Sequence, residues 1–273
     1  MRIVSLVCSN TEIVNALGMA SHLVAVDDHS DFPPAVVERL PRVGPELNID
    51  ADRVAALRPD LILASLSVPG HERVVSALRE KDLPLLVLDP TCLPDVFADI
   101  RTVAEALELP ERGDALVGEM ETAFANVREE AKCDDREPPP VLVEWWPEPV
   151  IAPGRLSWVH DLLELAGARN PLGREDVRSR PIPDEEVPGM APEAIVISWC
   201  GVRPSEYRPE VVARNPAWQE VPAVRNRQIH CVPESYLGRP GPRLVEGALA
   251  LRQVVRGIPG GSGSVREIFD RFR

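Results

Sequence analysis

An internal repeat is the sequence feature that most constrains how this chain can fold. Residues 52–65 (DRVAALRPDLILAS) align without gaps with residues 185–198 (EEVPGMAPEAIVIS). Both copies begin with an acid and contain a valine, an apolar residue, and a proline followed by an acid, before an apolar run that ends in serine. This pattern predicts a short helix, ended by proline, that leads into a buried parallel strand.

The two copies begin at residues 52 and 185, so about half of the 273-residue chain separates them. Apolar segments that read as strands alternate with helical patterns in both halves. These segments are 2–7, 23–26, 61–64 and 85–88, and then 141–144, 194–198 and 228–232. The helical patterns include 51–58, 70–80, 94–108 and 243–256. This alternation predicts parallel sheets whose strands are joined by helical crossovers.

A long helical pattern over 111–132 lies between the two halves, and a charged run followed by three prolines at 138–140 ends it. We therefore expect an α/β fold of two Rossmann-like lobes with mainly parallel sheets. One long rigid α-helix (111–133) should join an amino-terminal lobe (1–110) to a carboxy-terminal lobe (138–273). Residues 257–264 should form a flexible lead into a short tail. Because ligands gather beyond the carboxyl ends of parallel strands, the loops 65–69 and 199–203 should face each other across a ligand cleft between the lobes.

Two local signals concern the first helix. Ser9 and Glu12 have the spacing of a capping box, which predicts that the helix begins at Ser9. Gly18 fits the residue that follows a helix and takes a left-handed conformation.

Charge and motifs exclude several classes of function. The formal net charge is −13, and a chain this acidic offers no surface for nucleic acid or an anionic membrane. No apolar run is long enough to insert into a bilayer. The five cysteines and five histidines have no metal-ligand spacing, and no phosphate-binding or catalytic motif occurs, so neither a cofactor nor an enzymatic reaction is expected.

The amino terminus leads directly into the first expected strand and lacks a signal-peptide pattern. As written, the chain is expected in the cytoplasm. It is expected in the periplasm or at the cell surface if a leader has been removed.

Aromatic side chains stand out because they make up only 4% of the chain. Trp146 and Trp199 lie at the ends of expected strands, and Tyr236 lies in a loop rich in proline and glycine. Aromatic faces in such places suit a large, flat, partly apolar ligand.

Several further segments form a recognisable combination. They are SNTE at 9–12, ALG at 16–18, DFPP at 31–34, RVG at 42–44, ALRPDLI at 56–62, LAGA at 165–168, PEAIV at 192–196 and SYLGRPGPR at 235–243. In this combination, over residues 2 to about 256, the chain resembles the substrate-binding proteins of ABC importers. The similarity is to the class with two lobes and one rigid helix, which serves cobalamin, haem and ferric siderophores. The segments 199–201 (WCG) and 236–243 most resemble its cobalamin-binding branch.

The resemblance implies a monomeric protein that clamps cobalamin or a related corrinoid and delivers it to a permease with its ATPase. His29 stands where this class usually has a tyrosine, and Glu46 and Ser65 stand where the cobalamin binders have tryptophans. His29 is also the one candidate axial ligand for cobalt or iron. The candidate ligand contacts, which include the three aromatic residues, are His29, Glu46, Leu47, Ser65, Ser67, Trp146, Trp199, Arg203, Tyr236 and Arg239.

Asp52 and Glu185 occupy the positions of the two acids that dock such proteins onto permease arginines. The internal repeat independently makes them equivalent. Acids at these positions also suit the first turn of a helix.

Two alternatives remain open from the sequence. A haem or ferric-siderophore receptor of the same fold would need basic groups for an anionic ligand, and only Arg203 and Arg239 are obvious candidates. A cytoplasmic corrinoid-handling protein or enzyme would agree with the absence of a signal peptide.

Overall fold

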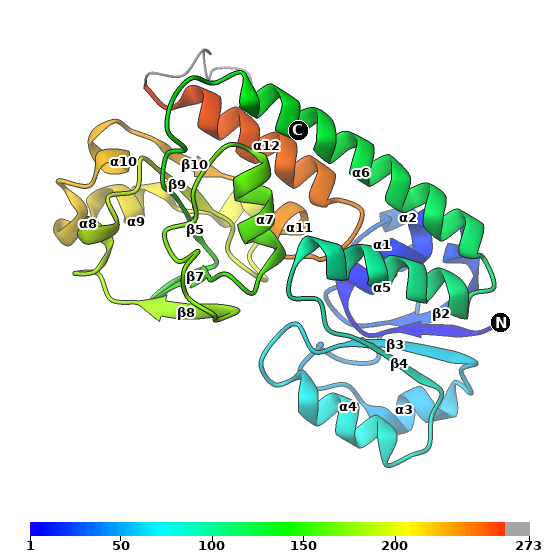
Figure 1. The fold of residues 1–273 in the computed structure, drawn as a ribbon. Coiled ribbons are helices and arrows are strands. Elements are labelled where there is room, and N and C mark those ends of the chain that lie inside the picture. The colour runs from blue at the N-terminus through cyan, green and yellow to red at the C-terminus, as the bar shows by residue number, and fades with distance from the viewer. Residues whose placement is uncertain (260–273) are drawn as a thin grey trace. The chain divides into compact units, whose positions relative to one another are not determined.

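The computed structural model describes residues 1–259 and divides into two compact units (Figure 1). Unit 1 runs from Met1 to Glu119, and unit 2 begins at Met120. Both units contain a parallel sheet with helical crossovers, which confirms the expected α/β fold of two lobes. Part of the predicted glycine-rich lead, 260–264, lies outside the described residues.

Unit 1 is built on a four-stranded parallel sheet in the order β2-β1-β3-β4. Its strands are β1 (Ile3–Ser5), β2 (Leu23–Val26), β3 (Leu61–Ser65) and β4 (Leu85–Leu88). Its helices are α1 (Cys8–Ala16), the short 3-10 helix η1 (Ala20–His22), α2 (Pro34–Val37), α3 (Ala51–Ala56), α4 (His71–Arg79) and α5 (Leu93–Ala106). Figure 1 shows α1 and α5 on one face of the sheet and α3 and α4 on the other.

Unit 2 is built on a three-stranded parallel sheet in the order β10-β9-β5. Its strands are β5 (Val141–Glu144), β9 (Ala194–Ile197) and β10 (Ile229–Cys231). The helices are α7 (Trp158–Leu165), α8 (Val187–Met190), α9 (Pro209–Arg214), α10 (Pro222–Arg225), α11 (Glu234–Leu237) and α12 (Leu244–Gly257), with 3-10 turns η2 (Pro204–Glu206) and η3 (Pro216–Trp218).

Unit 2 also contains an antiparallel sheet that the sequence did not predict. It has the order β6-β7-β8, with β6 (Trp146–Pro147), β7 (Val150–Pro153) and β8 (Ser179–Ile182). Each of these strands contains a proline, which cannot donate a ladder hydrogen bond and so weakens the sequence signal for a strand.

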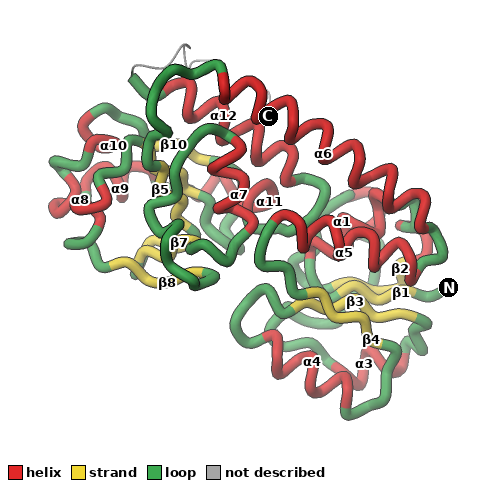
Figure 2. The backbone as a smooth tube through the Cα atoms, in the orientation of Figure 1, coloured by secondary structure: helices red, strands yellow, loops and turns green. Residues whose placement is uncertain are grey.

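Helix α6 (Pro110–Lys132) is continuous, as the sequence predicted (Figure 2). The boundary between the two units falls within this helix. Phe124 and Val127 on this helix are buried. After Lys132 the chain leaves the helix, and three prolines precede β5.

The repeated segments fold as predicted. In unit 1, helix α3 leads into β3, which pairs with β1 on one side and β4 on the other. In unit 2, helix α8 leads into β9, which pairs with β5 and β10. In each copy the strand lies inside its sheet and its side chains are buried on both faces, which explains its continuous apolar sequence.

The predicted start of the first helix is wrong. Helix α1 begins at Cys8 with Val7 at the N-cap, and no side chain caps it. Ser9 and Glu12 lie inside the helix and are buried. The predicted stop is confirmed, because Gly18 follows the C-cap residue Leu17 with a positive φ of 78°.

Candidate functional site

The loops at the carboxyl ends of the parallel strands carry most of the predicted ligand contacts. In unit 1 the loop after β2 contains His29, and an internal hydrogen-bond network fixes it. The Asp27 carboxylate accepts bonds from the backbone N–H of His29, at 2.8 Å, and from the Ser30 hydroxyl. Arg42 donates to the carbonyls of Asp27 and Ser30, each at 2.7 Å. His29 itself is exposed, so this loop presents an imidazole to solvent from a fixed backbone.

The loop that carries Glu46 and Leu47 lies beside the His29 loop. The backbone N–H of Asp28 donates to the carbonyl of Gly44, at 2.9 Å, and joins the two loops. Leu47 is 41% exposed, which is high for a leucine. The structure thus brings His29, Glu46 and Leu47 to one edge of unit 1.

His71, at the start of α4, is a residue that the sequence analysis did not select. Its side chain is only 3% exposed, and its Nε2 atom lies 3.9 Å from Oε2 of Glu46. Burial lowers the pKa of His71, so the imidazole is neutral at neutral pH. The sequence signal that could have identified His71 is its position in the segment that follows the repeated strand.

Ser65 ends β3, and Ser67 follows it in a tight turn. The Ser65 hydroxyl donates to Oγ of Ser67 at 2.8 Å and accepts from the Ser67 backbone N–H at 3.1 Å. Ser65 is buried and Ser67 is half-buried, so of the two the Ser67 side chain is nearer to solvent.

In unit 2, two predicted aromatic contacts are accessible. Trp146 on β6 is 42% exposed, and Tyr236 on α11 is half-buried. The guanidinium of Arg243 lies 4.9 Å from the centre of the Tyr236 ring, a cation–π arrangement that fixes the ring.

Trp199 occupies a different environment from the exposed stacking surface that the sequence analysis expected. It is 5% exposed and belongs to the apolar core of unit 2. Its ring packs edge-on against Tyr207, with the ring centres 5.7 Å apart. The reason is strand geometry: Trp199 continues the inward alternation of Ile195 and Ile197 beyond the end of β9.

The two basic residues predicted to contact the ligand, Arg239 and Arg203, both form ion pairs with glutamates. Nε of Arg239 lies 3.1 Å from Oε2 of Glu234, and Arg239 is buried. Arg203 is exposed and lies 2.8 Å from Oε1 of Glu206. Each guanidinium therefore has an internal counter-charge.

The strand ends and helix α11 of unit 2 are connected by aromatic side chains. The Tyr207 hydroxyl donates to the carbonyl of Trp199, at 3.4 Å, and accepts from the backbone N–H of Glu234, at 3.1 Å. The indole of Trp158 donates to the carbonyl of Leu237, at 2.7 Å, and packs against Trp145. These contacts hold Tyr236 in place relative to the sheet.

Asp52 and Glu185, the predicted docking acids, are both exposed. Asp52 lies in the first turn of α3 and pairs with Lys81, at 2.5 Å. Asp50 caps this helix instead, through a 2.9 Å bond from the Arg53 backbone N–H. Glu185 lies just before α8.

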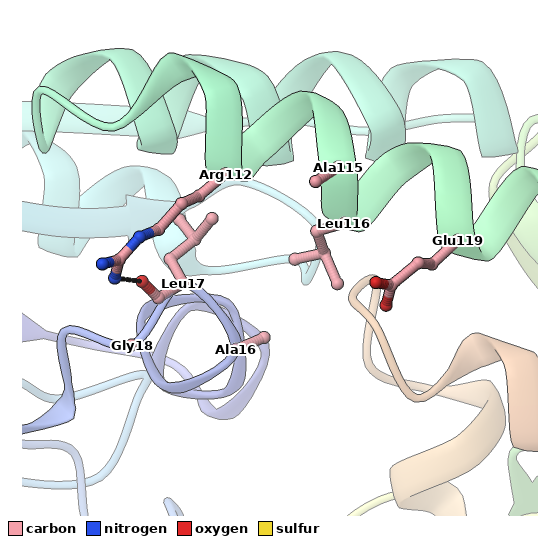
Figure 3. Close-up of a pocket in the computed structure, with 7 residues that line it drawn as sticks. All are labelled: Ala16, Leu17, Gly18, Arg112, Ala115, Leu116 and Glu119. Carbon is pink, nitrogen blue, oxygen red and sulfur yellow. Dashed lines mark hydrogen bonds between the residues drawn. The ribbon is translucent and has the colours of Figure 1, made fainter.

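A separate hollow of about 230 Å³ lies in unit 1, between the end of α1 and the start of α6 (Figure 3). Arg112 reaches across it and donates to the carbonyl of Leu17, at 3.0 Å. Small-molecule sites usually measure about 300–1,000 Å³, so this hollow is small for a large ligand.

Two further findings concern residues 1–259. They contain no group of three or more His, Cys, Asp and Glu side chains that could hold a metal ion. Within the same range, no helix has the length and apolar character needed to cross a membrane.

The fold and these strand-end loops define a two-lobed binding protein. The sequence pattern of the periplasmic binding protein family matches residues 3–236, and the chain belongs to this family.

Three similar proteins illustrate the family. An uncharacterized ABC transporter substrate-binding lipoprotein, YvrC of Bacillus subtilis strain 168, is 27% identical over 93% of this chain and 79% of its own length. A vitamin B12-binding protein of Pectobacterium carotovorum is 26% identical over 97% of this chain and 92% of its own. The apo structure of the periplasmic haem-binding protein RhuT of Roseiflexus sp. RS-1 superposes with a TM-score of 0.79 at 28% identity, over 93% of this chain and 98% of that protein. All three are named as binding proteins; the names give vitamin B12 for one and haem for another, and no ligand for the lipoprotein.

Proposed function

We propose that this protein is the substrate-binding component of an ABC-type importer and that it binds cobalamin or a related corrinoid. The similar vitamin B12-binding protein, aligned over nearly its whole length, supports this ligand class. In this proposal the protein acts without catalysis, as a monomer, on the outer side of the cytoplasmic membrane, and delivers its ligand to a permease with its ATPase.

The pairing of Arg203 and Arg239 with glutamates is the observation that most favours a corrinoid over haem. Haem carries two propionates, and an anionic chelate gains most from guanidinium groups that are available to it. A corrin ring has an apolar perimeter fringed with neutral amides. Such a ligand suits the exposed face of Trp146, the half-buried ring of Tyr236 and hydrogen-bonding groups such as Glu46 and Ser67.

Haem is the second candidate, and the exposed imidazole of His29 favours it. A neutral imidazole coordinates iron or cobalt, and the rigid loop around Asp27 would hold it in place. Coordination by His29 would shift the visible spectrum of bound haem or aquo-cobalamin, and His29→Ala would remove the shift.

Calorimetry with cyanocobalamin, haem and a ferric hydroxamate, each at the same protein concentration, tests the proposal. We expect cyanocobalamin to bind most tightly. Tighter binding of haem would assign the protein to the second candidate. Binding of none of the three would contradict the proposed function.

A further inference from the structure

Glu144 is a buried acid that neither the sequence analysis nor the proposed function uses. It is the last residue of β5, and it is 1% exposed. In the parallel register it lies opposite Ile197 of β9, which in turn lies opposite Cys231 of β10. Neighbours in register point to the same side of a sheet, and Leu142 and Ile197 belong to the apolar core of unit 2. The carboxyl of Glu144 therefore points into that core.

Among the described residues that shift the pKa of Glu144, none is a cation. Its Oε2 atom has no hydrogen-bond partner within the described residues. Burial raises the pKa of Glu144 to about 8, the charge of Asp184 adds to the rise, and the indole N–H of Trp199 opposes it. Glu144 is thus neutral at pH 7.

The other titratable groups around this core also favour neutral forms. Burial raises the pKa of the Cys231 thiol on β10 to about 11, and the charges of Glu210 on α9 and of Glu144 raise it further. Burial likewise raises the pKa of the Tyr207 phenol, near Glu234 of α11. A negative charge on Glu144 would therefore be opposed by nearby acids and by burial in the apolar core, which the indole N–H of Trp199 offsets only in part.

Backbone hydrogen bonds connect Glu144 and the residue after it to the segment that follows β9. The backbone N–H of Ser198 donates to the Glu144 carbonyl, at 2.9 Å, and that of Cys200 donates to the Trp145 carbonyl, at 3.1 Å. Trp146, the exposed aromatic residue, follows two residues after Glu144. Movement of the Glu144 carboxyl towards water would shift the ends of both β5 and β9.

We propose that Glu144 is a positioning residue for ligand binding and that it acts in its protonated form. The neutral carboxyl completes the core at the carboxyl end of β5, and its ionisation displaces the segment that carries Trp146. This proposal rests on the proposed function for its ligand, but the displacement itself requires no ligand.

The first experiment measures the affinity for cyanocobalamin, whose charge is constant, between pH 6.5 and 9.5. If only the protonated protein binds, the wild-type affinity falls about tenfold between pH 7 and pH 9. The neutral isostere Glu144→Gln should bind as the wild type does at pH 7 and show no such fall. Glu148→Gln, which changes an exposed glutamate in the turn between β6 and β7, is the matched control and should follow the wild type.

The second experiment follows tryptophan fluorescence of the ligand-free protein over the same pH range. We expect a transition near pH 8 in the wild type and in Glu148→Gln, and none in Glu144→Gln. A wild-type signal that is flat over this range overturns the role of Glu144, even if Glu144→Gln does not fold. So do equal transitions in the wild type and in Glu144→Gln. If the fluorescence transition occurs as expected but neither the wild type nor any variant binds cyanocobalamin, that result overturns the proposed ligand and the role of Glu144 in binding it. The displacement linked to ionisation of Glu144 would still stand.

Discussion

At the scale of single residues, exposure separates tryptophans that look alike in the sequence. Trp146 and Trp199 both follow strands, but Trp146 is 42% exposed and Trp199 is 5% exposed. We expect Trp146→Ala to weaken cyanocobalamin binding by about ten- to hundredfold, because an aromatic contact in an interface is worth roughly 1–3 kcal/mol. Calorimetry measures this loss directly.

The control for this variant is Leu249→Ala, because Leu249 on α12 is 46% exposed and is not among the predicted ligand contacts. It should leave the affinity unchanged. If both variants weakened binding equally, Trp146 would have no specific part in ligand contact.

His71 supplies a pH-dependent prediction at the same scale. Burial lowers its pKa in the folded protein below the ordinary 6.5, so the folded state binds fewer protons than the unfolded state. The contribution of neutral His71 to stability is therefore present above pH 6.5 and is lost as the pH falls through the lowered folded pKa. We expect His71→Gln to lose less stability than the wild type between pH 7 and pH 5 in denaturant titrations. Parallel loss in the two proteins would show that another group governs this range.

At the scale of elements, helix α6 contains two glycines in different surroundings. A Cβ at Gly118 would have no heavy atom within 4 Å, whereas a Cβ at Gly113 would lie 2.5 Å from Cβ of Ala104 on α5. We expect Gly118→Ala to stabilise the protein by about 0.5–1 kcal/mol, because alanine favours the helix. Gly113→Ala should destabilise it by about 1–3 kcal/mol, because the helices would be forced apart. Thermal unfolding of the pair tests both signs, and a shift in the same direction would contradict the packing at Ala104.

The strands and helices show how much of the fold the sequence could predict. Mainly apolar strands such as Leu23–Val26 and Val141–Glu144 were found at their observed bounds, because burial of side chains on both faces leaves a nearly continuous apolar signal. The antiparallel sheet β6-β7-β8 was missed because its strands contain proline. The capping box at Ser9 failed because the helix starts earlier, at Cys8, in buried surroundings where no side-chain cap forms.

The candidate site was less predictable than the fold for a related reason. Sequence position placed Trp199 at a strand end and Arg239 in the segment rich in proline and glycine before the last helix. It could not show that Trp199 faces the core or that Glu234 pairs with Arg239. The first outcome depends on the direction of a side chain beyond the end of its strand, and the second on how the turn after α11 folds a side chain back onto a glutamate five residues earlier. Glu144 had a readable signal, since it continues the inward alternation of Leu142.

At the scale of the whole molecule, the net charge of −13 attracts the protein to any basic partner surface. A test of Asp52 and Glu185 must therefore distinguish specific docking contacts from this general attraction. We expect the double variant Asp52→Ala with Glu185→Ala to lose binding to the permease complex in reconstituted membranes. Its melting temperature should stay within about two degrees of the wild type, because exposed ion pairs such as Asp52–Lys81 contribute little and Asp50 still caps α3.

Glu121→Ala with Glu130→Ala is the matched control, because both glutamates are exposed on α6 and their removal changes the net charge equally. If the control loses binding to the same extent, attraction is general and the two repeat acids are not specific contacts. If the Asp52 and Glu185 variant instead loses several degrees of melting temperature, these acids act on folding through their helix termini. Retained stability with loss of binding in that variant alone would place the docking contacts at the two equivalent positions of the internal repeat.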